Sequence, residues 1–249
     1  MSIRNLVKLI LGLPLAPFGL QVSTRREGRL FDYDDALKMA FDAVERPLVL
    51  DVGANEGQTV RYVLDRYKTV EVVAFEPNPR AYGVLAKLSE KYHFACHNVA
   101  LGDANSETVL HVLKHSESSS LLRPSSTGTQ AMPHLGDVDA TVKVPVRRLD
   151  DLMREWGIAR PVDLFKVDVQ GYEAKVLQGG METLKRSRYV LAETHFLPVY
   201  EGACCVDELC HLLFQAGFRL VRSIGYQPAT HTLDLVSTDL LFKRADIQV

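Results

Sequence analysis

PLVLDVGANEG, residues 47–57, is the most informative stretch of this chain. Its apolar run, which ends in Asp51, is typical of a buried parallel strand. Gly53 and Gly57 follow, and glycines allow a tight turn whose backbone passes close to a ligand where a side chain would collide. A strand, a glycine-rich turn and a helix together form the arrangement that binds nucleotide cofactors, so the stretch predicts an α/β fold with a cofactor turn.

The spacing of these glycines separates two kinds of cofactor. A dinucleotide turn needs G-x-G-x-x-G, whereas this turn reads GANEG and lacks one glycine. The carboxylate of Asp51 would repel a pyrophosphate, but it would suit the ammonium and hydroxyl groups of S-adenosylmethionine (SAM). We therefore expect SAM and keep a nicotinamide-linked oxidoreductase as the less favoured alternative.

Acidic residues close four of the predicted strands: Asp51, Glu76, Asp168 and Glu193. Because ligands of open α/β sheets bind outside the carboxyl ends of the strands, we expect these side chains to converge on one crevice. Glu76 follows Asp51 at about the separation at which such folds place an acid on a ribose diol. For each residue the structural alternative is a cap on the following helix.

Elsewhere the hydrophobic pattern predicts helices and strands in alternation, which indicates a parallel sheet. The expected helices cover 32–45, 59–67, 80–92, 149–156, 171–184 with a break at its two glycines, and 207–216. The expected strands cover 70–75, 93–99, 162–167, 189–192, 218–223 and 238–243. Extended segments at 108–113 and 141–146 flank the polar stretch 116–136, which predicts a hairpin-like insertion with a mobile loop that forms a lid or substrate wall.

Length and composition favour one catalytic domain over 46–249 after an N-terminal extension over 1–45. The chain has 249 residues and a formal net charge of -2, which argues against nucleic acid as its main partner. Its four cysteines show no CxxC spacing, so we expect reduced thiols and a cytoplasmic location.

Residues 3–22 are mostly apolar, with Arg4 and Lys8 near their start. Lys8, Pro14 and Pro17 interrupt the run, and no small-x-small cleavage site follows, so neither a signal peptide nor a transmembrane span is indicated. Two interpretations stay open. The segment lies at a membrane surface as an amphipathic anchor, or it packs on its own domain.

Several motifs along residues 48–243 resemble the FkbM family of SAM-dependent methyltransferases: VLDVGANEGQT, FEPNP, NVALGD, SSSLL, VPVRRLDDL, FKVDVQGYEAKVLQG and ETHF. The resemblance implies a class I, Rossmann-like methyltransferase fold, a mostly parallel seven-stranded sheet whose last strand runs antiparallel. It also implies methyl transfer to a hydroxyl of a sugar, a glycolipid or a secondary metabolite. One departure is Gln170, where the family commonly has Glu, and it removes a charge next to Asp168.

On the turn, the strand ends and this resemblance together, we predict that SAM contacts nine residues: Asp51, Gly53, Asn55, Gly57, Glu76, Asn98, Ala100, Ser119 and Asp168. Asn98 follows the third strand, where the adenine ring is expected. Its amide would bond an adenine edge or, equally, satisfy the backbone of its own turn.

Methyl transfer from a sulfonium requires alignment of the methyl group with the acceptor and removal of a hydroxyl proton. The catalytic candidates are His195, Asp168, Glu193, Lys166 and Glu173. Histidine is the commonest general base, and a structural hydrogen bond is the alternative role for His195. Lys166 lies two residues before Asp168, so strand alternation predicts that the two side chains share a face and pair.

Asp168, Glu193 and His195 also occupy places resembling those of the magnesium ligands in catechol O-methyltransferase. Carboxylates suit a hard cation, which would lower the pKa of an acceptor hydroxyl. We predict a site without metal and keep a divalent cation as the alternative. A noncatalytic SAM-binding module at a membrane surface is the alternative from a different functional class.

Overall fold

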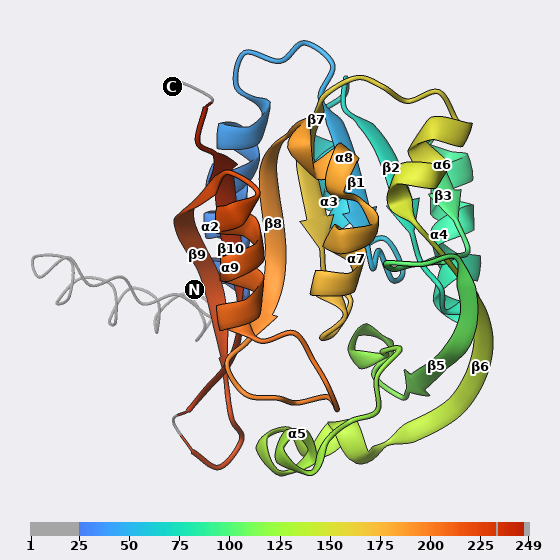
Figure 1. The fold of residues 1–249 in the computed structure, drawn as a ribbon, viewed down its shortest axis with the longest axis vertical. Helices are drawn as coiled ribbons and strands as arrows, with labels where there is room; N and C mark the ends of the chain where they lie inside the picture. The colour runs from blue at the N-terminus through green and yellow to red at the C-terminus, as the bar shows by residue number, and fades with distance from the viewer. Residues whose placement is uncertain (1–24, 233, 247–249) are drawn as a thin grey trace, which may run out of the picture.

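The computed structural model describes residues 25–232 and 234–246, and element labels follow Figure 1. Within these residues the chain forms a seven-stranded sheet in the order β3-β2-β1-β7-β8-β10-β9. The strands are β1 (Leu48–Val52), β2 (Glu71–Phe75), β3 (Ala95–His97), β7 (Val162–Val167), β8 (Ser187–His195), β9 (Phe218–Pro228) and β10 (Leu235–Arg244). β10 runs antiparallel to both of its neighbours, whereas the pairs from β3 to β8 are parallel. The predicted class I methyltransferase fold is confirmed.

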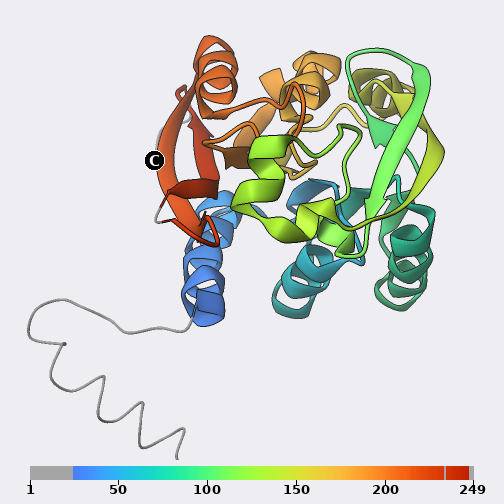
Figure 2. The ribbon, with the colours of Figure 1, turned by 90° about the horizontal axis from the view of Figure 1, so that it is seen from below.

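Helices cover both faces of this sheet (Figures 1 and 2). One face carries α2 (Arg25–Phe41), α3 (Gln58–Arg66) and α4 (Pro79–Tyr92), drawn blue to teal in Figure 2. The other carries α6 (Leu149–Glu155), α7 (Glu173–Gly179), α8 (Met181–Lys185) and α9 (Val206–Gln215). Because both faces are covered, β1 is buried along its whole length, as its unbroken apolar run predicts.

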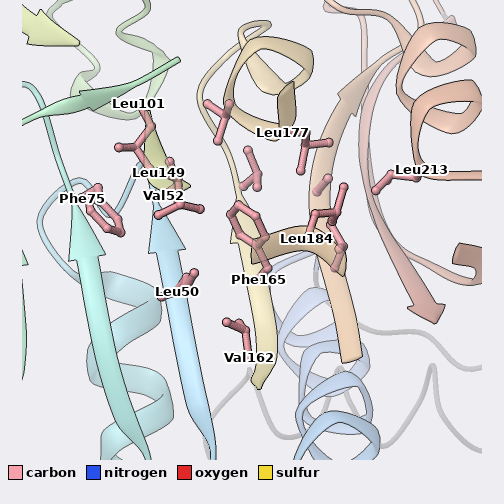
Figure 3. Packing of buried hydrophobic residues seen from close by; sticks show 14 of the residues in the cluster. Leu50, Val52, Phe75, Leu101, Leu149, Val162, Phe165, Leu177, Leu184 and Leu213 are labelled. Carbon is pink, nitrogen blue, oxygen red and sulfur yellow. The ribbon is translucent and has the colours of Figure 1, made fainter. Parts of the chain in front are cut away.

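Side-chain alternation along β1 divides the core in two. Leu50 and Val52 pack with Phe75, Phe165 and the α6–α9 helices, as Figure 3 shows. Val49 points the other way and packs with the α2, α3 and α4 side chains. Asp51 has the same parity as Val49, so its carboxylate faces the α2–α3 side.

The helix predicted over 32–45 begins earlier and ends at Phe41, and its residues Ala36, Leu37 and Ala40 are fully buried against the sheet. The hydrophobic core therefore begins before residue 46. The predicted membrane segment 3–22 lies outside the described residues. None of the helices that the structure describes is long and apolar enough to cross a bilayer.

A second sheet, three-stranded in the described chain, carries the insertion in the order β4-β6-β5. It contains β4 (Ala100–Leu101), β5 (Ser106–Leu113) and β6 (Val138–Arg147), and the antiparallel β5–β6 pair confirms the predicted hairpin. The prediction of a mobile loop between them is corrected. That segment contains η2 (Ser116–Ser118), α5 (Ser126–Ala131) and η3 (Pro133–Gly136), because Met132 and Leu135 are buried against Val199 and Tyr200.

Among the strands whose bounds differ from the prediction, β8 and β3 change the position of site residues. β8 was expected over 189–192 but runs to His195, because β10 pairs with it up to the Ser237–His195 position. Glu193 and His195 thus lie inside a strand and not beyond its end. β3 is shorter than the predicted 93–99, which leaves Asn98 in the connection before β4.

Candidate active site

A cavity of about 340 Å³ lies at the carboxyl ends of the central strands, beside the point where strand order reverses between β1 and β7. The turn after β1 contributes Gly53 and Asn55, and the ends of β2 and β7 contribute Glu76 and Asp168. The insertion supplies the opposite wall, including Ser119. This volume lies in the range of small-molecule sites, and the position is where open α/β sheets bind ligands.

Gly53 sets the floor of the cavity. Its φ is +81°, and a Cβ atom there would lie 1.8 Å from the carbonyl oxygen of Asp168. The N–H group of Gly53 donates to the carbonyl of Phe75 at 3.0 Å. Glycine is required because the turn after β1 and the end of β7 approach so closely.

The carboxylate of Glu76 is fixed between two backbone donors. Oε2 accepts from the N–H of Asn55 at 2.8 Å and Oε1 accepts from that of Asn78 at 2.7 Å. Only 7 % of the residue is exposed, and this burial raises the pKa of Glu76 to about 7 against the lowering effect of both bonds. Each carboxylate oxygen retains a lone pair for a ligand hydroxyl.

Lys166 joins two acidic residues beside the cavity. Its ammonium lies 3.2 Å from Oδ1 of Asp51 and 3.4 Å from Oδ2 of Asp168, so the predicted Lys166–Asp168 pair is present. Burial alone would lower the pKa of Lys166, but the two carboxylates outweigh it and raise that pKa. Asp51 does not line the cavity: it faces Lys166 across the β1–β7 pair, where the two residues are in register.

Gln170 joins Asp168 to Glu193. Its Nε2 donates to Oδ1 of Asp168 at 3.0 Å and makes a short hydrogen bond to Oε2 of Glu193. Ser237 donates to the other oxygen, Oε1 of Glu193, at 3.3 Å. Burial, together with the charges of Asp168 and Asp239, raises the pKa of Glu193 well above its usual range.

The cavity is strongly acidic. In the part of the chain that the structure describes, Lys166 is its one cationic lining residue, and five lining residues are acidic: Glu76, Glu117, Asp168, Glu193 and Asp239. Because Lys166 is already paired with two carboxylates, the lining favours a positively charged ligand over a phosphate-bearing one.

Gly57 and Asn98 do not line the cavity. Gly57 has a φ of +85°, and a Cβ atom there would meet Leu88 of α4 at 2.5 Å, so the packing of α4 requires a glycine at this position. The amide of Asn98 donates to the carbonyls of Glu76 at 2.8 Å and of Pro77 at 3.1 Å. These contacts match the alternative in which the Asn98 amide satisfies nearby backbone groups. Asn98 thereby holds the backbone that carries Glu76.

Glu173 and His195 also lie outside the cavity lining. Oε1 of Glu173 accepts from the N–H groups of Val169 and Gly171, both at 3.1 Å, and burial raises the pKa of Glu173 to about 7. His195 is 1 % exposed, its ring lies edge-on to that of Tyr200, and burial lowers the pKa of His195 to about 4.

Of the other predicted residues, Gly53, Asn55, Ala100, Ser119, Lys166 and Glu193 do line the cavity. Sequence reasoning did not assign Tyr33, Ser116, Tyr172 or Asp239 to it. The last strand was predicted, but the antiparallel register that sets Asp239 opposite Glu193 is seen only in the structure. Tyr33 comes from a helix assigned to the extension, and no sequence pattern placed it in the cavity.

The divalent-cation alternative finds little support in the donor set. Across residues 25–232 and 234–246, no group of three or more His, Cys, Asp and Glu side chains is placed to hold a metal ion. Between Asp168 and Glu193 lies the Gln170 amide nitrogen, which is a hydrogen-bond donor and not a metal ligand.

Comparison with known proteins identifies the family. The Methyltransferase FkbM domain matches residues 51–220. The chain is 31% identical over 176 residues to the 2-O-methyltransferase NoeI of Sinorhizobium fredii, covering 67% of this chain and 71% of that one. It is 29% identical over 210 residues to the methyltransferase sdnD of Sordaria araneosa, covering 71% and 75%. The crystal structure of magnesium protoporphyrin IX methyltransferase from Synechocystis, with 11% identity and 98% of each chain covered, gives a TM-score of 0.46. The family model covers most of the chain, so this protein belongs to the FkbM family of methyltransferases.

Proposed function

We propose that this protein is a SAM-dependent O-methyltransferase that acts on a hydroxyl of a sugar, a glycolipid or a secondary metabolite. The observation that carries the proposal is the acidic cavity built around Glu76 and the Gly53 turn. Its lining suits a ligand that bears both a sulfonium and an ammonium group. When bound, SAM supplies a methyl group activated toward attack by an oxygen nucleophile.

The residues of the cavity fit such a cofactor. Glu76 would accept hydrogen bonds from the two ribose hydroxyls, because its carboxylate is already oriented by Asn55 and Asn78. Phe75 and Leu101 offer an apolar wall for a purine ring. The Gly53 turn leaves the backbone bare beside the space in which the amino-acid part of SAM would lie.

Asp168 and Glu193 are proposed to remove the proton of the acceptor hydroxyl. Both line the cavity, and the side chain of Asp168 is 26% exposed there. Burial and the neighbouring charges of Asp168 and Asp239 raise the pKa of Glu193, so its carboxylate binds a proton more strongly than an ordinary carboxylate does, as a general base requires. Because Gln170 bridges the two carboxylates, their titrations belong to the pair and not to either residue.

The choice of a hydroxyl acceptor is supported by the relative NoeI, whose name describes methyl transfer to an oxygen. Serine hydroxyls in the cavity lining also suit a ligand rich in hydroxyl groups. The 3–22 segment as a membrane contact, which would bring the enzyme to a glycolipid, stays a prediction.

Two experiments test the proposal. The first is calorimetric titration with SAM and S-adenosylhomocysteine, and the second measures transfer of labelled methyl groups to a panel of sugars, glycolipids and polyketide alcohols. We expect binding of both cofactor forms and label on at least one hydroxyl. Absence of SAM binding would contradict the proposal. Binding of SAM without transfer to any acceptor in the panel would instead favour the noncatalytic module, and tight binding of NAD would favour the oxidoreductase.

His195→Gln is expected to leave kcat within about threefold of the wild-type value, because the His195 ring lies outside the cavity and is too weak a base at a pKa of about 4. Steady-state rates with a saturating acceptor would measure this. A loss of 100-fold or more with an unchanged melting temperature would restore His195 as the base.

A further inference from the structure

Gln170 occupies a backbone position that its surroundings determine. It follows β7 with a φ of +56°, in the left-handed region. Its carbonyl oxygen accepts from Oγ of Ser120 at 2.7 Å. The Tyr200 hydroxyl lies 2.9 Å from Oε1 of Gln170 and 2.8 Å from the carbonyl oxygen of Ser118, and its single proton serves one of these two acceptors at a time. The two carboxylates set the orientation of the amide, because only its N–H side can donate to Asp168 and Glu193.

The amide nitrogen completes the hydrogen bonding of that pair. Gln170 Nε2 meets Oδ1 of Asp168 and Oε2 of Glu193, while Lys166 lies beside Oδ2 of Asp168 and Ser237 donates to Oε1 of Glu193. Every oxygen of both carboxylates therefore faces a donor. Two carboxylates brought together without such partners repel each other, and proteins usually relieve this with a shared proton or a cation.

We propose that Gln170 is a positioning residue whose amide takes the place that a bridging divalent cation would need, so that Asp168 and Glu193 act as a pair without metal. The catalytic part of this inference rests on the proposed function. The other part, that the wild-type site binds no divalent cation, does not. An amide N–H cannot ligate a cation, whereas a carboxylate at the same position would add the missing oxygen ligand. Gln170→Glu should then turn the site into one that requires a cation.

Two variants separate the roles. Gln170→Glu replaces the donor with an acceptor, and Gln170→Met removes hydrogen bonding at similar length. Both are unbranched, like glutamine, so the cost of the left-handed backbone is matched among the three proteins. Melting temperatures are measured for all three in EDTA and in a MgCl2 series, with neither cofactor nor acceptor present. We expect Mg²⁺ to raise the melting temperature of Gln170→Glu and to leave the wild type and Gln170→Met unchanged.

The catalytic arm uses the same proteins. The wild-type kcat/KM is expected to be equal in EDTA and in MgCl2. The kcat/KM of Gln170→Glu should fall at least about tenfold in EDTA and recover in MgCl2. The kcat/KM of Gln170→Met should fall about tenfold in both conditions. Any one of three results would overturn the inference. The wild-type enzyme would need Mg²⁺, the Gln170→Glu protein would respond to Mg²⁺ in neither the thermal nor the catalytic measurement, or the Gln170→Met protein would keep the wild-type kcat/KM. Absence of any methyl transfer by the wild type would contradict the proposed function alone, because the thermal arm uses neither SAM nor acceptor.

Discussion

Glu76→Ala is expected to weaken SAM binding by at least about 100-fold. Hydrogen bonds to a charged group contribute about 1.5–3 kcal/mol each, and the variant would lose two of them from the ribose. It would also leave the N–H groups of Asn55 and Asn78 without their carboxylate acceptor. Calorimetric titration of SAM measures the loss.

Glu90→Ala is the matched control for this variant. Glu90 is an exposed glutamate of α4, the helix that follows Glu76 in the chain, and it does not line the cavity. Its substitution should leave the Kd for SAM unchanged. Equal Kd values for Glu76→Ala and the wild type would show that the ribose lies elsewhere.

Glu76 also predicts how the affinity for SAM depends on pH. In the free protein burial raises the pKa of Glu76 to about 7, so the carboxyl is protonated below that pH. Ribose hydroxyls donate to the ionised form, so SAM binding lowers this pKa and releases a proton. The Kd should therefore rise as pH falls below about 7, approaching tenfold per pH unit, and Glu76→Gln should lose this dependence. A wild-type Kd that stays constant between about pH 5.5 and 8 would contradict Glu76 as the ribose acceptor.

Asp168→Asn is expected to lower kcat by about 10²–10⁴-fold, the usual contribution of a general base. The variant keeps the shape of the side chain but removes the carboxylate that Gln170 and Lys166 hold in the cavity. Glu193→Gln should have a loss of similar size. The double variant should be little worse than either single one, because residues that act as a unit are not additive.

Rates at saturating SAM and acceptor, with SAM affinity measured in parallel, separate this loss from a binding defect. Asp103→Asn serves as the matched control, since Asp103 makes a surface ion pair with Lys175 and lies outside the cavity lining. Near-normal turnover by Asp168→Asn, or losses that multiply in the double variant, would remove the carboxylate pair from the mechanism.

Local pattern predicted the parts of the fold that depend on local physics. The apolar run before Asp51 is a central strand, and the predicted strands and helices follow one another along the chain as the structure has them. Hydrophobic periodicity predicts this because it reports which side of an element is buried. The helix predicted to break at two glycines is indeed two helices, α7 and α8, which meet at Gly180. The polar stretch 116–136 was misread, because its few apolar residues are buried by Val199, Tyr200, Ala229 and Val236, which lie far along the chain.

The candidate site shows the same division. Its place at the strand ends and the presence of Glu76 and Asp168 in it followed from the sequence, since the carboxyl ends of parallel strands share one edge. Which other acids face the cavity did not follow, because the facing side of a residue alternates with each position and so depends on strand ends and register. The extension of β8 to His195 and its pairing with β10 bring Glu193 beside Asp239, while Asp51 pairs with Lys166.

The sequence alone thus determined that this is a class I methyltransferase with a SAM-type turn, because the glycine turn, the strand pattern and the ordered motifs are local features. The tertiary structure decided what the departure at Gln170 does. Its amide, in the connection after β7, meets Glu193, which lies 23 residues further along the chain on β8, and such a contact exists only once β7 and β8 have paired.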